Sequence, residues 1–273
     1  MRLGTALVCL CSIVIFGSFT PSQAQRKNIE KRIDPQDSHS DLTKDIKNLQ
    51  QQQQQIIEEL NDLKRVLSAT AAPGLAPRLP DSLEIVGELF SGDSKAPVAI
   101  VEYADFECPF CGMYARQVYP QIDENYIKTG KVKFFYRDFP IPTHSHALSA
   151  ARAARCAGEQ GKYWEIHDNL FANQTALGLN DIFERAKKFG IDVQKLSECL
   201  SSEKYAEDIR KGMAEAQQLG VQATPTFFLG FIGSNGDAVS VEKRIVGAAP
   251  YEVFRTDLDA LLAVKSEQTI SSH

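Results

Sequence analysis

Two cysteines, Cys108 and Cys111, are separated by two residues at the end of the stretch VEYADFECPFC. Thiols at this spacing bind zinc, form an inert structural disulfide, or form a disulfide that exchanges with other thiols. A zinc site needs a second pair of ligands, but beyond residues 1–24 the remaining cysteines Cys156 and Cys199 stand alone, and His144 and His146 lie only two residues apart. We therefore expect no resident metal ion and no cofactor.

The position of Cys108 favours exchange over an inert bridge. The apolar run before it predicts a buried strand over 97–104, and residues 111–130 predict a helix. At the start of that helix, unpaired backbone N–H groups and the helix dipole lower the pKa of a thiol. We expect Cys108 to attack substrates and Cys111, one turn into the helix, to resolve the intermediate.

A second motif lies more than a hundred residues further on, in QATPTFF. Thr224 and Pro225 stand at the start of an apolar strand, where proline lacks a hydrogen-bond donor and is tolerated as an edge residue or in the cis form. Alone, this dipeptide predicts an ordinary turn. Together with the cysteine pair, it predicts a cis-proline beside the thiols.

The two motifs, and the long helical stretch between them, resemble the DsbA-like branch of the thioredoxin superfamily, the exported thiol–disulfide oxidoreductases of bacteria. The resemblance implies that Cys108 is the attacking cysteine, Cys111 the resolving cysteine and Pro225 the cis-proline. Thr224 before that proline resembles the pattern of disulfide isomerases and of oligomeric DsbA-like proteins.

Glu102, six residues before Cys108, matches a buried acid that assists proton transfer to the resolving cysteine in such proteins. A carboxyl group in an apolar strand has a raised pKa and suits that role. The alternative is a carboxylate at a strand end that faces solvent, and the sequence does not choose between the two.

The residue between the two cysteines affects the stability of the Cys108 thiolate. Phe110 stands where the best-known DsbA proteins have histidine, so one stabiliser of the thiolate is missing and the balance of oxidase and isomerase activity stays open.

Cys156 and Cys199 lie in the helical stretch without close partners. We expect a structural disulfide between them, with two buried reduced thiols as the alternative.

The elements that must position these residues follow from periodicity. Strands are predicted over 131–139, 225–230 and 243–248, and a final helix over 250–264. The fold class is therefore α/β: a thioredoxin-like domain over 83–265 with a helical insertion over about 144–220.

The N-terminal part predicts an oligomerisation helix over 25–67. Apolar residues alternate at steps of four and three through residues 41–67, as in a coiled coil, with Gln53 as a polar seam residue. A low-complexity linker at the glutamine run 50–55 is the weaker alternative, because the seam continues in phase on both sides. A Pro/Ala-rich linker is expected over 68–82.

Residues 1–24 resemble a cleavable signal peptide, which predicts export to the periplasm. The net charge of −5 without a basic block disfavours nucleic acid as a partner. The expected partners are reduced or misfolded exported proteins, a membrane redox partner and further copies of this chain. The alternative function is an oligomeric periplasmic chaperone or a copper-handling protein that uses CPFC without turnover.

Overall fold

The computed structural model describes residues 44–56, 58–59 and 78–271. The chain divides into two compact units, Met1–Leu75 and Ala76–His273, and each is described here by itself. In these described ranges no helix is both long and apolar enough to cross a lipid bilayer.

In the first unit, the described residues 44–56 form a helix. Its large apolar side chains Ile46, Leu49 and Ile56 are all exposed. The outer parts of the predicted N-terminal organisation lie outside the described residues: the signal peptide over 1–24, the seam residues Leu42, Leu60, Leu63 and Leu67, and most of the linker over 68–82.

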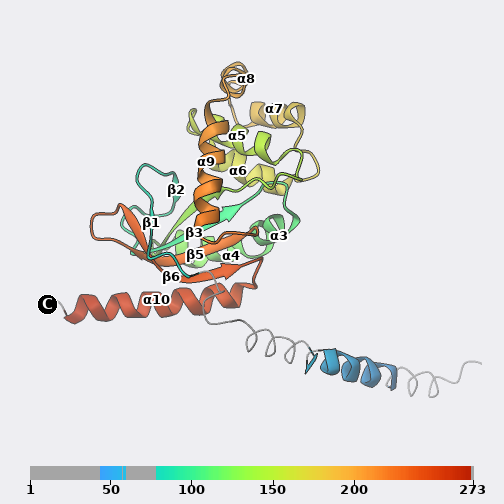
Figure 1. Cartoon of the computed structure of the whole chain (residues 1–273), viewed down its shortest axis with the longest axis vertical. Coiled ribbons are helices and arrows are strands. Elements are labelled where there is room, and N and C mark those ends of the chain that lie inside the picture. Colours follow the sequence, from blue (N-terminus) through green and yellow to red (C-terminus); the bar gives the residue numbers. More distant parts are fainter. Residues whose placement is uncertain (1–43, 57, 60–77, 272–273) are drawn as a thin grey trace, which may run out of the picture. The chain divides into compact units, whose positions relative to one another are not determined.

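The second unit is built on a six-stranded mixed sheet with the strand order β1-β6-β5-β3-β4-β2 (Figure 1). Only β3 and β4 are parallel to each other, and all other pairs are antiparallel. The strands are β1 Ser82–Glu84, β2 Phe90–Ser91, β3 Val98–Ala104, β4 Val132–Asp138, β5 Thr226–Ile232 and β6 Ala238–Val246.

The central strand β3 follows directly from its sequence, since VAIVEYA is buried at every position. The two edge strands β1 and β2 were not predicted, because two or three residues are too short to show a period of two. The start of β6 was also placed too late: the strand begins at Ala238, and its first part alternates the buried Val239 and Val241 with exposed polar residues.

The prediction of one continuous helix over 111–130 was wrong. The chain forms α3 over Pro109–Gln117, α4 over Tyr119–Ile122 and a π-helical turn, η1, over Asp123–Ile127. Pro120 provides the physical reason, because it has no N–H to donate to the carbonyl one turn earlier.

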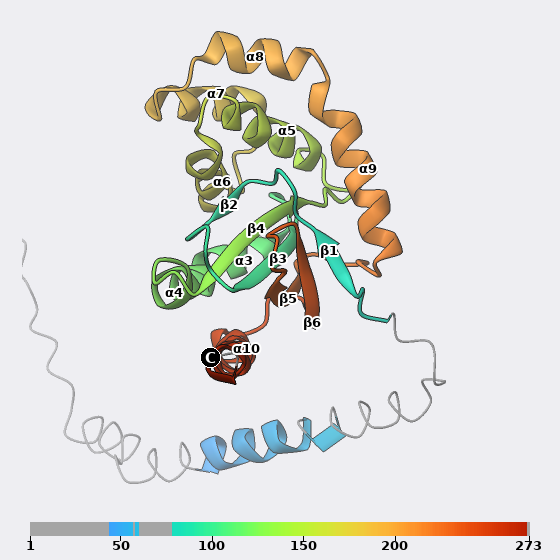
Figure 2. The ribbon, with the colours of Figure 1, turned by 90° about the vertical axis from the view of Figure 1, so that its left-hand side faces the viewer.

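Five helices lie between β4 and β5 in the sequence, and α10 closes the chain. In both views α5 to α8 lie together, and α10 lies apart from them against the sheet (Figure 1, Figure 2). The helices are α5 Ala147–Gly158, α6 Tyr163–Ala172, α7 Leu179–Lys188, α8 Val193–Ser201, α9 Lys204–Gln218 and α10 Tyr251–Ser271.

The sheet has an apolar core on each face. The larger core contains Cys111, Phe134 and Phe227 together with apolar residues of α3, α5, α6 and α10. The smaller core contains Tyr103 and Phe228 with residues of α9. The cysteine pair is thus embedded at the margin of the larger core, where packing fixes it.

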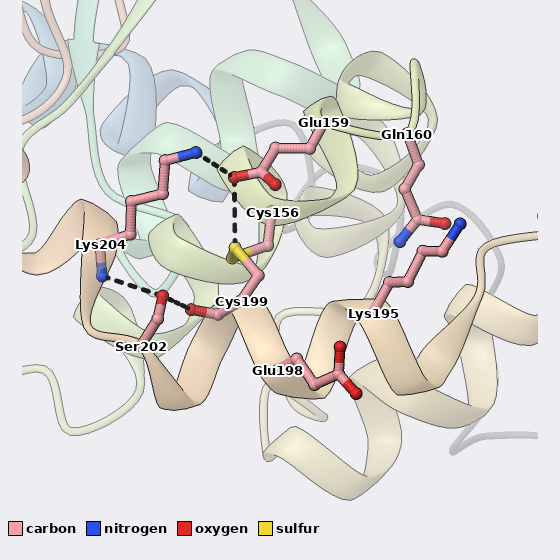
Figure 3. A pocket seen from close by; sticks show the side chains of 8 residues that line it. All are labelled: Cys156, Glu159, Gln160, Lys195, Glu198, Cys199, Ser202 and Lys204. Atoms are coloured by element: carbon pink, nitrogen blue, oxygen red, sulfur yellow. Dashed lines mark hydrogen bonds and ion pairs between the residues drawn. A yellow bond between two sulfur atoms is a disulfide. The ribbon is translucent and has the colours of Figure 1, made fainter.

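Cys156 on α5 and Cys199 on α8 form a disulfide with a Cα–Cα distance of 5.9 Å. They lie in a pocket of about 500 Å³ (Figure 3). Glu159 on its wall accepts hydrogen bonds from Lys204 Nζ at 2.8 Å and from the Tyr205 hydroxyl at 2.9 Å. The bridge therefore joins α5, the first of the inserted helices, to α8.

Candidate active site

Cys108 is the N-cap of α3, and Pro109 is the first residue of the helix. The backbone N–H of Cys108 donates to the carbonyl of Asp105 at 3.1 Å, which closes the turn after β3. Gly112 N–H in turn donates to the Cys108 carbonyl at 3.1 Å. The thiol consequently lies beside the unpaired N–H groups of the first helical turn.

Both cysteines of the pair are free thiols, and their pKa values move in opposite directions. The pKa of Cys108 falls to about 5, mainly because the Cys111 thiol donates a hydrogen bond, helped by Thr224 and the N–H groups of Phe110 and Cys111. Burial raises the pKa of Cys111 far above its ordinary range, and Cys108 and Glu102 add to the rise. At neutral pH the pair holds one thiolate, on Cys108.

The Thr224–Pro225 peptide bond is cis. The Thr224 carbonyl lies 3.5 Å from Cys108 Sγ, across 116 residues of sequence. The structure thus brings the two motifs of the sequence into contact. Phe110, between the cysteines, is 60% exposed, whereas Cys108 is 4% exposed and Cys111 is 0% exposed.

Glu102 is buried on β3, with 2% of its surface exposed, so the alternative of a solvent-facing carboxylate is wrong. Its neighbours in register are Phe227 on β5 and Tyr136 on β4. Burial raises its pKa well above the ordinary value, and the charge of Cys108 adds to the rise. Because its pKa is raised, this carboxyl group holds a proton more readily than an ordinary glutamate.

Gln174 is a site residue that the sequence analysis missed. Its side-chain amide donates to the carbonyls of Phe106 at 2.9 Å and Cys108 at 2.8 Å. A Cβ at Gly112 would lie 1.7 Å from Gln174 Oε1, so a larger residue at this position would displace the Gln174 amide from the turn. No local pattern marks Gln174, since the contact spans 66 residues.

His144 and His146 also lie at the site. Both precede α5 and contact the turn that carries Cys108. His144 Nδ1 lies 2.7 Å from the buried Asp105 carboxylate. The His146 N–H donates to Glu107 at 2.6 Å, which helps to lower the pKa of Glu107 against the effect of burial.

Metal binding would need further ligands near these thiols. In the part of the chain that the structure describes, no three His, Cys, Asp or Glu side chains converge on a point that could hold an ion.

The fold and the site together define the class of protein. The sheet is of the thioredoxin type, a cysteine pair lies at the start of a helix, and a cis-proline lies beside it. These features define a thioredoxin-fold protein with a redox-active CxxC site.

Comparison with known proteins agrees with this class. A family model described as Thioredoxin matches residues 84–235, more than half of the chain. The probable disulfide bond formation protein D of Bacillus anthracis is 33% identical over 164 residues, covering 56% of this chain and 75% of that protein. The chain therefore belongs to the thioredoxin family, in its DsbA-like branch.

Two further similarities show how far the match extends. The crystal structure of Wolbachia pipientis alpha-DsbA1 has a TM-score of 0.59 and 25% identity, over 70% of this chain and 96% of that one. The Na(+)/H(+) antiporter NhaA 3 of Salinispora tropica is 38% identical over 139 residues. That match spans half of this chain and 21% of the antiporter's length, so it concerns only one part of the antiporter.

Proposed function

We propose that this chain is an exported thiol–disulfide oxidoreductase that introduces and reshuffles disulfide bonds in other exported proteins. The asymmetry of the cysteine pair carries the proposal: the pKa of Cys108 is about 5, and Cys111 is buried with a raised pKa. A thiolate of low pKa is a good leaving group, which favours the reduced pair and hence oxidation of substrates. The name of the Bacillus anthracis relative agrees with this direction.

Oxidation begins with the disulfide between Cys108 and Cys111. A substrate thiolate attacks Cys108 Sγ, and Cys111 leaves with the electron pair of the broken bond and takes up a proton. A second substrate thiolate then attacks the substrate sulfur of the mixed disulfide and expels Cys108 as a thiolate. The substrate gains a disulfide, and the cysteine pair gains two electrons.

Isomerisation uses the reduced pair. The Cys108 thiolate attacks a wrong substrate disulfide and is expelled when the correct pair forms, with Cys111 available to release a trapped substrate. The cis Thr224–Pro225 edge lies against Cys108, so an extended substrate segment can pair beside it as an added strand.

The remaining partners follow from this chemistry. Reduced pairs must be reoxidised, and we assign this step to a membrane redox partner in the periplasm, which the chain reaches through the signal peptide over 1–24. Self-association through residues 41–67 would hold several Cys108 centres near one substrate and raise their effective concentration. The exposed apolar side chains Ile46, Leu49 and Ile56 support this assembly.

Oxidative refolding of a reduced client with the full-length chain tests the proposal. Cys108→Ala is expected to abolish acceleration of refolding. Cys111→Ala, the matched variant one turn away, is mixed instead with a scrambled client that already contains disulfides. Its Cys108 thiolate is expected to attack one of these bonds and to stay trapped in a mixed disulfide that a non-reducing gel detects.

An unchanged refolding rate with Cys108→Ala would overturn the enzymatic proposal. Protection of a client from aggregation by that variant would then favour the chaperone alternative. Stoichiometric binding of Cu(I) by the reduced pair, without any effect on refolding, would favour copper handling.

A further inference from the structure

Five buried polar atoms beneath the cysteine pair have no hydrogen-bond partner among the described residues: Glu102 Oε1, Asp138 Oδ1, His167 Nε2 and the hydroxyls of Tyr114 and Tyr136. A buried polar atom without a partner costs about 1–3 kcal/mol. Natural proteins usually satisfy such atoms with ordered internal water. Three of them, on Glu102, Tyr136 and Asp138, belong to the adjacent strands β3 and β4, so the same internal waters can serve them.

Four of these groups form a sequence that leads away from Cys111. Glu102 and Tyr136 are paired in register on the parallel strands β3 and β4, so their side chains lie side by side on one face. Asp138, two residues further along β4, faces the same way. The His167 ring lies edge-on to the Tyr136 ring at a centroid distance of 4.6 Å.

Tyr136 is suited to pass protons without storing charge. Burial raises its pKa well above the ordinary value, with contributions from the nearby Asp138, Tyr163, Cys111 and Glu102. Its hydroxyl therefore stays neutral, and it can accept one proton while it donates another. The same interactions place the hydroxyl within electrostatic range of both Cys111 and Glu102.

Beyond Tyr136 the path meets a cavity. A space of about 730 Å³ lies beside β4, and both Tyr136 and Asp138 line it. The short strand β2 pairs only with residues 134–135, so it does not cover this part of β4. The exposed residues Val86 and Glu215 also line the cavity, so it is open to solvent.

On the substrate side, the described residues enclose Cys111. Cys111 is fully buried, and Cys108 is covered by the Thr224 carbonyl. A substrate paired beside Pro225 would close this side further. Protons must nevertheless leave Cys111 each time it attacks a mixed disulfide, because the thiolate is the nucleophile.

We propose that the proton of Cys111 leaves through the rear of the domain, from Glu102 to the Tyr136 hydroxyl and on to solvent in the cavity beside β4. This inference rests on the proposed thiol–disulfide exchange and names Tyr136 as a positioning and relay residue for it. Glu102 is the first acceptor, and Asp138 provides an acceptor on the cavity side.

Each atom in the step is accounted for. In the mixed disulfide between Cys108 and a substrate, the Cys111 thiol gives its proton to the Glu102 carboxylate. The Cys111 thiolate attacks Cys108 Sγ, and the substrate sulfur leaves with the electron pair. Glu102 then gives the proton to the Tyr136 hydroxyl, which releases its own proton to water in the cavity.

Stopped-flow reaction of the reduced full-length chain with Ellman's reagent separates the two steps. The first thionitrobenzoate appears when Cys108 attacks the reagent, and the second appears when Cys111 resolves the mixed disulfide. For Tyr136→Phe we expect an unchanged first phase, a second phase slower by roughly tenfold or more, and a changed solvent deuterium isotope effect on that phase only.

Tyr114→Phe is the matched control. It removes another buried, unpartnered hydroxyl, which also interacts with Glu102, but Tyr114 does not line the cavity. We expect wild-type kinetics in both phases for this variant. Thermal unfolding of both variants should show the cooperative transition of a folded domain, since each change removes only one hydroxyl group from the core.

A double variant tests whether Glu102 and Tyr136 act on the same proton path. If Glu102 and Tyr136 act in series, Glu102→Gln combined with Tyr136→Phe resolves no more slowly than Glu102→Gln alone. A wild-type second phase in Tyr136→Phe, or equal slowing in Tyr114→Phe, would overturn the rear path and leave the proposed exchange intact. Absence of any second phase in the wild type would instead overturn the proposed exchange.

Discussion

Cys108 and Cys111 carry the same side chain and have pKa values displaced in opposite directions. Cys108 receives hydrogen bonds from Cys111 and the first N–H groups of α3, whereas Cys111 lies in the core beside the carboxyl group of Glu102. The difference thus arises from placement, because a single helical turn separates stabilised charge from excluded charge.

The acidity of Cys108 predicts how stability depends on pH. Its pKa in the folded reduced protein is about 5, below the ordinary thiol value of 9.0. Between these values the folded state binds fewer protons than the unfolded state, so the free energy of unfolding of the reduced form rises with pH. We expect the stability of the reduced form relative to the oxidised form to decrease as pH falls toward about 5.

Thermal unfolding of both redox forms across this range measures the effect. The oxidised form is the internal control, since it has no thiol at Cys108 to titrate. A difference between the two forms that stays constant between neutral pH and about pH 5 would contradict the lowered pKa.

At the scale of elements, residues of the helical insertion and of the segment before α5 hold the turn that starts α3. Gln174 binds two carbonyls of the turn, and His144 and His146 contact Asp105 and Glu107. The insertion therefore helps to orient the N–H groups that face Cys108, in addition to packing against the sheet.

Gln174→Ala tests this function. Loss of its two hydrogen bonds to the turn, together with the bond it accepts from Arg116, should destabilise the fold by about 1–3 kcal/mol. The pKa of the Cys108 thiol should rise, because the turn loosens. Denaturant unfolding and the pH dependence of alkylation at Cys108 measure the two effects.

Gln160→Ala is the matched control, since Gln160 makes two similar bonds to the Asp192 backbone within the insertion. It should lose similar stability without any change in the pKa of Cys108. Equal pKa shifts in both variants would refute a specific function of Gln174.

The disulfide between Cys156 and Cys199 closes a segment with a sequence separation of 43. Replacing both cysteines with alanine removes this restriction on the unfolded chain, so we expect a loss of about 2–4 kcal/mol in the free energy of unfolding. Urea denaturation of the oxidised proteins measures it, and equal unfolding midpoints and slopes for the variant and the wild type would exclude a stabilising function.

At the scale of the whole molecule, the chain combines a thioredoxin-fold domain with an N-terminal helix. The exposed side chains Leu49 and Ile56 lie on its predicted seam. Leu49→Asp with Ile56→Asp is expected to reduce the solution mass to that of a monomer, because charges cannot be buried in the seam. Light scattering coupled to size-exclusion chromatography measures the mass.

Gln51→Asp is the control for this variant, since Gln51 falls on the opposite side of the heptad. It should leave the mass unchanged. If the wild type itself has the mass of one chain, the proposed coiled coil is incorrect.

The sequence alone determined the family and the principal site residues. CPFC after a buried apolar run and Thr-Pro before another are local patterns, and helix and strand periods are local as well. They were therefore sufficient to predict the α/β class, a helical segment between the two motifs, and the DsbA-like resemblance carried by Cys108, Cys111 and Pro225.

Only the tertiary structure decided the rest. It buried Glu102 beside Tyr136, brought Gln174, His144 and His146 to the turn, and bonded Cys156 to Cys199. These relations join residues that lie tens of positions apart, and periodicity carries no information about such contacts. Burial and the pKa values that follow from it depend on which surfaces pack together, which is a property of the folded chain.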